Sequence, residues 1–278
     1  MRLVAFGKWA GIVGAYNSLI AYGKRTGTFE LKRANQCFDM KEMFGCASKI
    51  KLPNIKILIT GGGRVAHGAM ETYAAANIKE VDPEHFLTKE FLEPVVCRID
   101  PWHYAKRKDG SEFDFNHFIK HPCEYESTFK PFQHVSDVYI PCHFWDPASP
   151  KFILSEDYLD PKFRIRVIAD VSCDMEGPIA STLRASTIAS PFYGYDPHTG
   201  KESDPFDEKN ITVTSIDNLP GELPRDSSED FSMALALHIF PAFATGDPDG
   251  IIERATIIKK GKLTRKFSYL KDFLEGKE

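Results

Sequence analysis

The 278-residue sequence lacks an excess of charge of either sign, since 35 Lys and Arg residues face 39 Asp and Glu residues for a formal net charge of −4. Such a small charge disfavours a protein that binds the phosphate backbone of a nucleic acid. Apolar residues make up 42% of the chain, and this share excludes the weakly hydrophobic class of disordered proteins. The length allows one large domain or two modest ones, with a sizeable core.

Paired cysteines and an unbroken apolar run are also missing. The six cysteines are scattered without a CxxC pair, which excludes a disulfide scaffold and favours a reducing cytosol. The apolar stretch 3–22 is interrupted by Lys8 and by glycines, and the basic pair Lys24-Arg25 follows it. A secretory signal has its charge first, and a membrane span has no such breaks. We therefore expect a cytoplasmic protein without a membrane segment, and a buried helix over 9–22.

Strand and helix patterns alternate along much of the chain. They predict an α/β fold in which a Rossmann-like, mainly parallel sheet carries helices on both faces. The expected strands cover 55–60, 78–81, 135–143, 166–171 and 211–216, and the expected helices cover 39–49, 65–76 and 226–243. Two segments break the alternation. Residues 93–132 are interpreted as an irregular elaboration rich in histidine and aromatic residues, and 191–207 as a loop or hairpin.

A glycine-rich turn follows the first expected strand. Residues 61–66 (GGGRVA) fit the pattern G-x-G-x-x-G/A between a strand and a helix. In this pattern Gly61 makes the tight turn, Gly63 lets the backbone approach a pyrophosphate, and the helix amino terminus offers free N–H groups. Asp82 ends the next strand 21 residues after Gly61, near the spacing of a carboxylate that binds the adenosine ribose. The pattern predicts a dinucleotide site that prefers NAD to NADP, a preference that Lys79 weakens. A glycine turn without a ligand is the alternative.

Other polar groups have a structural interpretation as well as a functional one. The segment 117–123 carries two histidines and a cysteine in a zinc-like spacing, but a proline breaks the helix that would align them, so we expect no metal. Cys142 beside His143 could be a thiol nucleophile, although the end of an apolar strand favours a small core residue. The runs 170–174 (DVSCD) and 215–220 (SIDNLP) follow strands, where open α/β sheets bind ligands. A turn cap is the alternative for the last carboxylate of the first run.

Five stretches of the chain carry a family resemblance. They are 2–7 with 10–11 (RLVAFG, AG), 57–69 (ILITGGGRVAHGA), 167–174 (VIADVSCD), the RASTIASPFYGYDP run from Arg184, and 215–225 (SIDNLPGELPR). Together they resemble the lysine-forming saccharopine dehydrogenases of the alanine dehydrogenase and transhydrogenase superfamily. The resemblance implies NAD-dependent oxidation of saccharopine to L-lysine and 2-oxoglutarate, or the reverse, in a cleft between two lobes. A catalytically silent NAD-binding module and an alanine dehydrogenase-like enzyme are the alternatives.

The resemblance also implies roles by position. Cofactor contacts fall on Gly61, Gly63, Arg64, Asp82, Phe144, Val171, Ile216, Asp217, Asn218 and Leu219, and saccharopine contacts fall on Arg2, Phe6, Ser172, Cys173 and Asp174. Arg2 also fits on chemical grounds, because a substrate with three carboxylates favours bidentate guanidinium partners. Met1 stands where a cofactor-binding arginine occurs in the family.

Three parts of the chain are implied by the same resemblance. Residues 1–25 connect the lobes, 26–214 form the NAD-binding domain, and 215–278 return to the catalytic lobe. The family's catalytic lysine and histidine precede the segment that matches 2–7, so no residue here is assigned their roles. We therefore expect weak NAD binding, little turnover, and self-association through an apolar face around 9–22 and 233–243.

Overall fold

The computed structural model describes residues 2–277, so Met1, the counterpart of the family's arginine, lies outside the described residues. The chain divides into two compact units, of which the larger covers Phe6–Ser227 and the smaller combines 2–5 with 228–277. The helix expected to connect two lobes lies within the larger unit, and this unit extends past residue 214. Within 2–277, no helix combines the length and the apolar character that crossing a bilayer requires.

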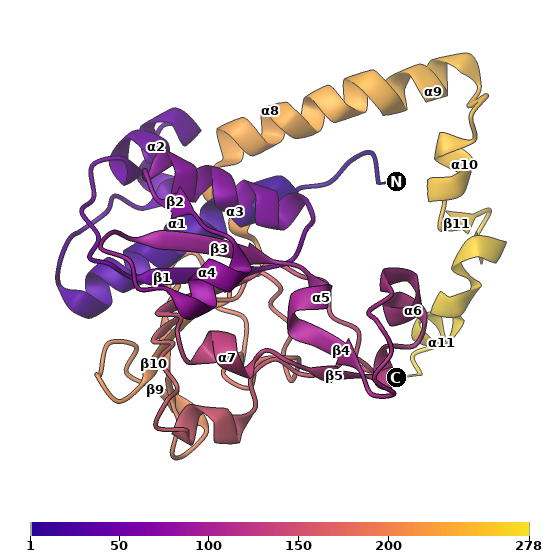
Figure 1. Ribbon diagram of the computed structural model, residues 1–278. Helices are drawn as coiled ribbons and strands as arrows, with labels where there is room; N and C mark the ends of the chain where they lie inside the picture. The colour runs from indigo at the N-terminus through magenta and orange to yellow at the C-terminus, as the bar shows by residue number, and fades with distance from the viewer. Residues whose placement is uncertain (1, 278) are drawn as a thin grey trace. The chain divides into compact units, whose positions relative to one another are not determined.

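An eight-stranded sheet forms the centre of the larger unit (Figure 1). Its six parallel strands are β1 (Lys56–Thr60), β2 (Lys79–Glu80), β3 (Val95–Ile99), β6 (Val138–Pro141), β7 (Val167–Ala169) and β10 (Ile211–Thr214). The hairpin of β8 (Tyr193–Asp196) and β9 (Lys201–Ser203) extends one edge in the antiparallel sense. Across the sheet the order is β2-β3-β1-β6-β7-β10-β8-β9. The prediction of an α/β fold with a mainly parallel sheet is confirmed.

Helices cover both faces of the sheet. Side chains of the central strand alternate, so that Ile57 and Ile59 join one buried cluster and Leu58 joins the other. The first cluster includes α1 (Gly7–Thr26), α2 (Met40–Ala47) and α3 (Arg64–Ala75), and the second includes α4 (Pro83–Thr88), α5 (Pro101–Tyr104) and α7 (Lys130–Gln133). Short 3-10 helices lie at Ala34–Gln36, Pro122–Glu124, Ser155–Leu159 and Leu219–Glu222.

Two glycines let α1 and α3 cross with their backbones in contact. A β-carbon added at Gly11 would lie 1.8 Å from the carbonyl oxygen of Val65, and one added at Gly68 would lie 2.1 Å from that of Lys8. Neither distance leaves room for a side chain. Because Val65 is in the first turn of α3, the crossing also fixes where the amino terminus of α3 points.

Residues 93–132 contain a central strand, and the expectation of an irregular elaboration is wrong for their first part. β3 pairs with β1 on one side and with β2 on the other. Its five residues, VVCRI, are apolar apart from one arginine, and so short a run carries no periodicity that separates a strand from a loop. The remainder forms the hairpin of β4 (Ala105–Arg107) and β5 (Tyr125–Ser127), with α6 (Phe115–Lys120) between these strands in the chain.

The smaller unit is reached through α8 (Pro224–Ala234), which is followed by a π-helical turn (Leu235–Ile239) and α9 (Phe240–Thr245). The expected helix over 226–243 is thus present, with a π turn where Pro241 supplies no N–H group. The unit continues with α10 (Ile251–Ala255), the hairpin of β11 (Ile258–Lys259) and β12 (Lys262–Leu263), a 3-10 helix (Arg265–Leu270) and α11 (Lys271–Leu274).

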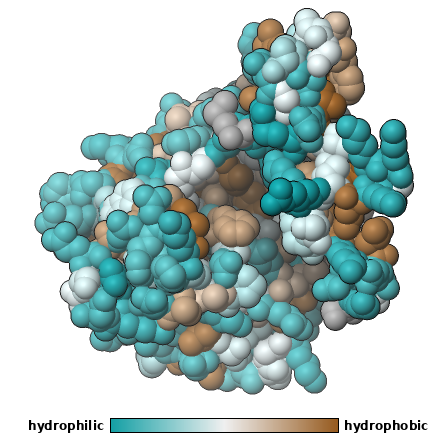
Figure 2. All heavy atoms as spheres, turned by 90° about the vertical axis from the view of Figure 1, so that its right-hand side faces the viewer, coloured by the Kyte–Doolittle hydropathy of each residue, from teal (hydrophilic) through white to brown (hydrophobic). Residues whose placement is uncertain are grey.

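The expected apolar face is half correct. Around 9–22 it is wrong, because most side chains of α1 are buried in the first cluster. In the smaller unit, Met233, Leu237, Phe240 and Phe243 are 57–66% exposed. Figure 2 shows apolar side chains at the surface among hydrophilic ones. Exposed apolar patches favour association, so self-association through 233–243 stays a prediction.

Candidate functional site

The glycine turn lies between β1 and α3, as the sequence pattern predicts. Gly61 has a φ of +114°, and a β-carbon there would lie 2.7 Å from the carbonyl oxygen of Cys142. Gly63 is different, because a β-carbon at this position would meet nothing within 4 Å. Gly63 also caps α3 without a side-chain hydrogen bond. The turn therefore leaves open space at the positive end of a 12-residue helix, which is the geometry that binds phosphate groups.

His143 supports this turn from the neighbouring strand. It follows β6, is 8% exposed, and its Nδ1 lies 2.7 Å from Oγ1 of Thr60, the last residue of β1. Its Nε2 has no hydrogen-bond partner among the described residues, and its ring stacks on Phe152 with centroids 4.2 Å apart. Burial lowers the pKa of His143 to about 3. Burial also raises the pKa of the Cys142 thiol, so Cys142 suits the core better than nucleophilic chemistry.

The buried imidazole predicts an acid-sensitive fold. Below the ordinary histidine pKa of about 6.5 the unfolded chain binds a proton at His143, whereas the folded chain stays neutral there to about pH 3. The free energy of unfolding should fall by about 1 kcal/mol per pH unit between about pH 6 and pH 4 from this residue. Urea unfolding of the wild type and of His143→Gln at several pH values measures it.

The carboxyls of Asp170, which is buried, and Asp174, which is half-buried, change the stability in the opposite sense, so the comparison with His143→Gln is decisive. Burial raises the pKa values of Asp170 and Asp174, and a carboxyl with a raised pKa adds stability as the pH falls. Subtracting the variant's pH profile removes these shared contributions. Parallel profiles for the two proteins would contradict the prediction.

Asp170 organises the loop that follows β7. Its buried carboxylate accepts hydrogen bonds from Thr182 Oγ1 at 2.6 Å and from Ser172 Oγ at 2.6 Å. It also accepts from the backbone N–H groups of Ser172 at 3.0 Å and Cys173 at 3.1 Å. Cys173 has a φ of +54°, a left-handed conformation uncommon for a residue with a side chain. The four hydrogen bonds therefore hold a strained loop at the carboxyl end of the sheet.

A cavity of about 340 Å³ opens beside this loop. Six residues predicted from the sequence line it, namely Val171, Ser172, Cys173, Ile216, Asp217 and Leu219. They come together because β7 and β10 are neighbours and both strands end at this edge. Ala10, Met175, Ala185 and Pro220 complete the lining. No histidine or lysine occurs among these described lining residues.

An ion pair anchors the 3-10 helix Leu219–Glu222, which contributes Leu219 and Pro220 to the lining of this cavity. Glu222, fully buried, accepts hydrogen bonds from Asn17 Nδ2 at 2.8 Å and from Arg33 Nη2 at 3.0 Å. The pair ties the 3-10 helix Leu219–Glu222 to α1 and to the segment before α2. Sequence patterns gave no signal for these contacts, because Asn17 and Arg33 are 205 and 189 residues from Glu222.

Other predicted residues are not among the lining residues of the cavity. Asp174 and Asn218 neighbour lining residues in sequence but do not line it. Phe144, expected near the adenine, is 91% exposed. Arg2 belongs to the smaller unit, whereas Phe6 and the turn residue Arg64 belong to the larger one.

Asp82 lies at the carboxyl end of the edge strand β2. Its carboxylate caps α4 by accepting from the His85 N–H at 2.9 Å, and His85 Nδ1 lies 2.5 Å from its second oxygen. The backbone hydrogen bond from His85, together with that imidazole, lowers the pKa of Asp82. β3 separates β2 from β1, so at about 4.8 Å per strand β2 lies about 10 Å from β1.

The zinc-like segment holds no metal cluster. Within residues 2–277 no group of three His, Cys, Asp or Glu side chains has a metal-binding arrangement. His117 and His121 lie near Glu124 instead, with closest nitrogen-to-oxygen distances of 3.5 and 3.8 Å.

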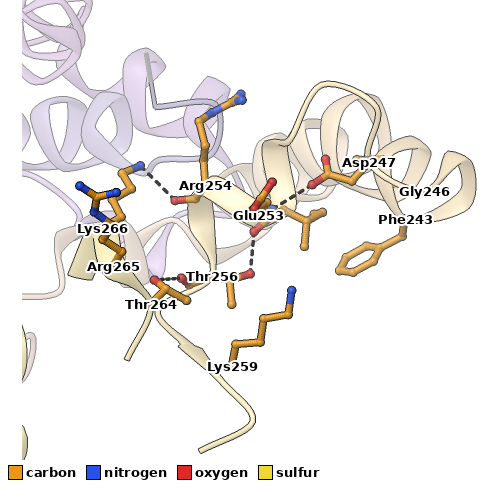
Figure 3. Close-up of a pocket in the computed structure, with 12 residues that line it drawn as sticks. Phe243, Gly246, Asp247, Glu253, Arg254, Thr256, Lys259, Thr264, Arg265 and Lys266 are labelled. Atoms are coloured by element: carbon orange, nitrogen blue, oxygen red, sulfur yellow. Dashed lines mark hydrogen bonds between the residues drawn. The ribbon is translucent and has the colours of Figure 1, made fainter. Parts of the chain in front are cut away.

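A cavity of about 840 Å³ is in the smaller unit and is lined by residues of 242–266 (Figure 3). Internal hydrogen bonds shape it, including those from Thr264 Oγ1 to the Thr256 carbonyl at 2.7 Å and from Lys266 Nζ to the Arg254 carbonyl at 3.0 Å. None of the predicted site residues lines this cavity. We therefore place the candidate site at the glycine turn and the 340 Å³ cavity, both in the larger unit.

Comparison with family models finds no match. The alpha-aminoadipic semialdehyde synthase of Arabidopsis thaliana is 24% identical over 310 residues, which cover 97% of this chain. The NAD+-dependent, L-lysine-forming saccharopine dehydrogenase of Emericella nidulans is 28% identical over 200 residues, which cover 70% of this chain. Both similarities support the resemblance to the saccharopine dehydrogenases that the sequence motifs carry. The chain spans 29% and 44% of the lengths of these two relatives.

A solved L-alanine dehydrogenase has a fold similar to that of this chain. The match has a TM-score of 0.52 at 13% identity, and it covers 97% of this chain and 64% of the other. At that identity the likeness concerns the fold alone. It confirms the Rossmann-like architecture that the sequence pattern predicts.

Proposed function

We propose that the chain is the dinucleotide-binding part of an NAD-dependent oxidoreductase of amino-acid metabolism, with saccharopine, or lysine plus 2-oxoglutarate, as its substrate. The observation that carries the proposal is the placement of an open glycine turn and a cavity lined by Ser172, Cys173 and Asp217 at the carboxyl ends of the same parallel sheet. Dinucleotides bind across this edge of such sheets, with the pyrophosphate at the turn. The relatives' names supply the substrate class.

The residues of the turn fit NAD. The space around Gly63 admits the pyrophosphate, and the uncapped N–H groups of α3 face it. From there the cofactor would extend along the edge, with Val171, Ile216 and Asp217 at its nicotinamide end. When bound, NAD supplies the acceptor for a hydride.

The cavity can orient the substrate. The hydroxyl of Ser172 donates a hydrogen bond to the carboxylate of Asp170. The lone pairs of the Ser172 oxygen therefore remain to accept a hydrogen bond from a substrate amine. In the proposed oxidation a hydride passes to NAD+ from the carbon beside the secondary amine of saccharopine, the amine releases its proton, and a C=N bond forms. Water then adds, the C–N bond breaks, and lysine and 2-oxoglutarate are released. The reverse sequence forms saccharopine from the same groups.

The described cavity lacks the lysine and histidine to which the family resemblance assigns acid–base catalysis. Its lining holds a serine, a cysteine and a carboxylate but no histidine or lysine, and a positioned acid or base contributes about 10²–10⁴-fold to a rate. We therefore expect the chain alone to bind ligands with little turnover. The same observation favours a second candidate function, a catalytically silent NAD-binding module.

Calorimetry on the NAD+-loaded chain tests the substrate. Saccharopine should give saturable binding, and alanine at the same concentrations should give none. An alanine dehydrogenase-like enzyme would have the same glycine turn and cavity, but the residues that contact its substrate would differ. A silent module predicts NAD+ binding without a response to either amino acid. Equal binding of alanine and saccharopine would overturn the assignment of saccharopine as the substrate. Rapid lysine formation would overturn the expectation of low turnover.

A further inference from the structure

The strand beside β1 determines which carboxylate can reach a bound adenosine. In dinucleotide-binding sheets the usual strand order is 3-2-1-4-5-6, and the acidic residue for the ribose follows the strand next to strand 1. Here that neighbour is β3, whereas β2 is at the edge of the sheet. Thr60 pairs with Ile99, and the N–H of Gly61 donates to the carbonyl of Ile99 at 2.9 Å. The residue after β3, Asp100, therefore emerges beside the glycine turn.

The side chain of Asp100 lies against this turn. A β-carbon added at Gly62 would be 2.5 Å from Oδ1 of Asp100. The guanidinium of Arg98 holds the carboxylate in place, because its Nη1 donates both to Asp100 Oδ1 at 2.7 Å and to the carbonyl of Gly61 at 3.1 Å. The Asp100 side chain is 13% exposed, so the carboxylate is fixed but still reaches solvent.

Asp82 differs from Asp100 in each of these respects. Its side chain is 53% exposed, and its oxygens are engaged by the backbone and the ring of His85. Its strand is separated from the glycine turn by the full width of β3. Each carboxylate belongs to the N-cap residue of a short helix, α4 for Asp82 and α5 for Asp100, so capping does not distinguish them and the position beside the glycine turn does.

We propose that Asp100, and not Asp82, is the carboxylate that binds the adenosine ribose and sets the preference for NAD over NADP. This inference rests on the proposed function, since it requires a dinucleotide at the glycine turn. A carboxylate accepts hydrogen bonds from both ribose hydroxyls, and it repels the 2′-phosphate of NADP. The ion pair with Arg98 holds the carboxylate of Asp100 beside Gly62.

Titrations of the full chain with NAD+ and NADP+ test the inference. Asp100→Asn keeps the shape but removes the charge, and it should weaken NAD+ binding by about 10-fold to 100-fold, the effect of losing charge-assisted hydrogen bonds. The ratio of NAD+ to NADP+ affinity should fall by a similar factor. Asp82→Asn is the competing assignment, and Glu80→Gln, an exposed change of the same charge in β2, is the matched control. Both should stay within about twofold of the wild type, since neither change removes a ribose contact.

A second measurement needs no change at Asp100, in case that variant does not fold. Wild type and Asp82→Asn should both bind 2′-deoxy-NAD+ about 10-fold more weakly than NAD+, because the lost hydroxyl contact belongs to Asp100 in each. Loss of NAD+ affinity in Asp82→Asn alone, or NADP+ binding as tight as NAD+ binding in the wild type, would overturn the inference. If the wild type binds NAD+ and Asp100→Asn binds it equally well, the inference alone fails. If the wild type binds neither dinucleotide, the proposed function fails with it.

Discussion

Replacing Gly63 with valine should abolish NAD+ binding and leave the fold intact. The φ and ψ of Gly63 are −92° and −172°, an extended conformation that valine adopts readily. An added β-carbon meets no protein atom within 4 Å, so the new side chain projects into the space proposed for the pyrophosphate. We expect NAD+ affinity to fall on the order of 100-fold or more, because close backbone approach is what this glycine provides.

Stability separates this loss from a folding defect. Valine is a poorer helix cap than glycine, at a cost of about 1 kcal/mol, so the melting temperature should change only slightly. Gly45→Ala serves as the matched control, because Gly45 lies in α2 and its added β-carbon also meets nothing within 4 Å. The control should bind NAD+ like the wild type. Tight NAD+ binding by Gly63→Val would place the pyrophosphate elsewhere.

Replacing Gly11 with alanine should destabilise the larger unit severely. Alanine favours a helix over glycine by about 1 kcal/mol, but here its methyl group would lie 1.8 Å from the Val65 carbonyl oxygen. That oxygen belongs to backbone and cannot rotate away, so α1 and α3 must separate. Overpacking of this kind costs about 3 kcal/mol or more, and the net loss should exceed the gain in helix propensity. Urea unfolding measures it.

The same change should impair the cofactor site. α3 begins directly after Gly63, and its amino terminus would move when the crossing with α1 opens. Gly68→Ala, whose methyl group would lie 2.1 Å from the Lys8 carbonyl oxygen, should behave like Gly11→Ala. Gly45→Ala should instead be neutral or slightly stabilising. A Gly11→Ala protein as stable as the wild type would show that the two helices are not in contact.

Local signals allowed much of the fold to be predicted. The unit of strand, glycine turn and helix over 56–75 was predictable because each part has its own pattern in adjacent residues. Asp39 likewise signals α2, and its side chain accepts from the Glu42 N–H at 2.8 Å. The buried helix α1 was predictable from its apolar residues, although the crossing that needs Gly11 and Gly68 was not.

Non-local pairing explains what was missed. β3 has too few residues to show a period, and its place beside β1 depends on contacts with residues about 40 positions earlier in the chain. Without β3, the spacing after the glycine turn points to Asp82 and leaves Asp100 inside an apparently irregular segment. The hydrogen bonds of Asp170 and the ion pair of Glu222 were missed for the same reason.

A calorimetric titration of the wild-type chain and of Gly63→Val with NAD+ tests the central claim most directly. The glycine turn as the pyrophosphate site predicts saturable binding of one NAD+ per chain, and its loss in a variant that melts like the wild type. No heat of binding with the folded wild-type chain, or the same affinity in both proteins, would contradict an NAD site at the end of β1.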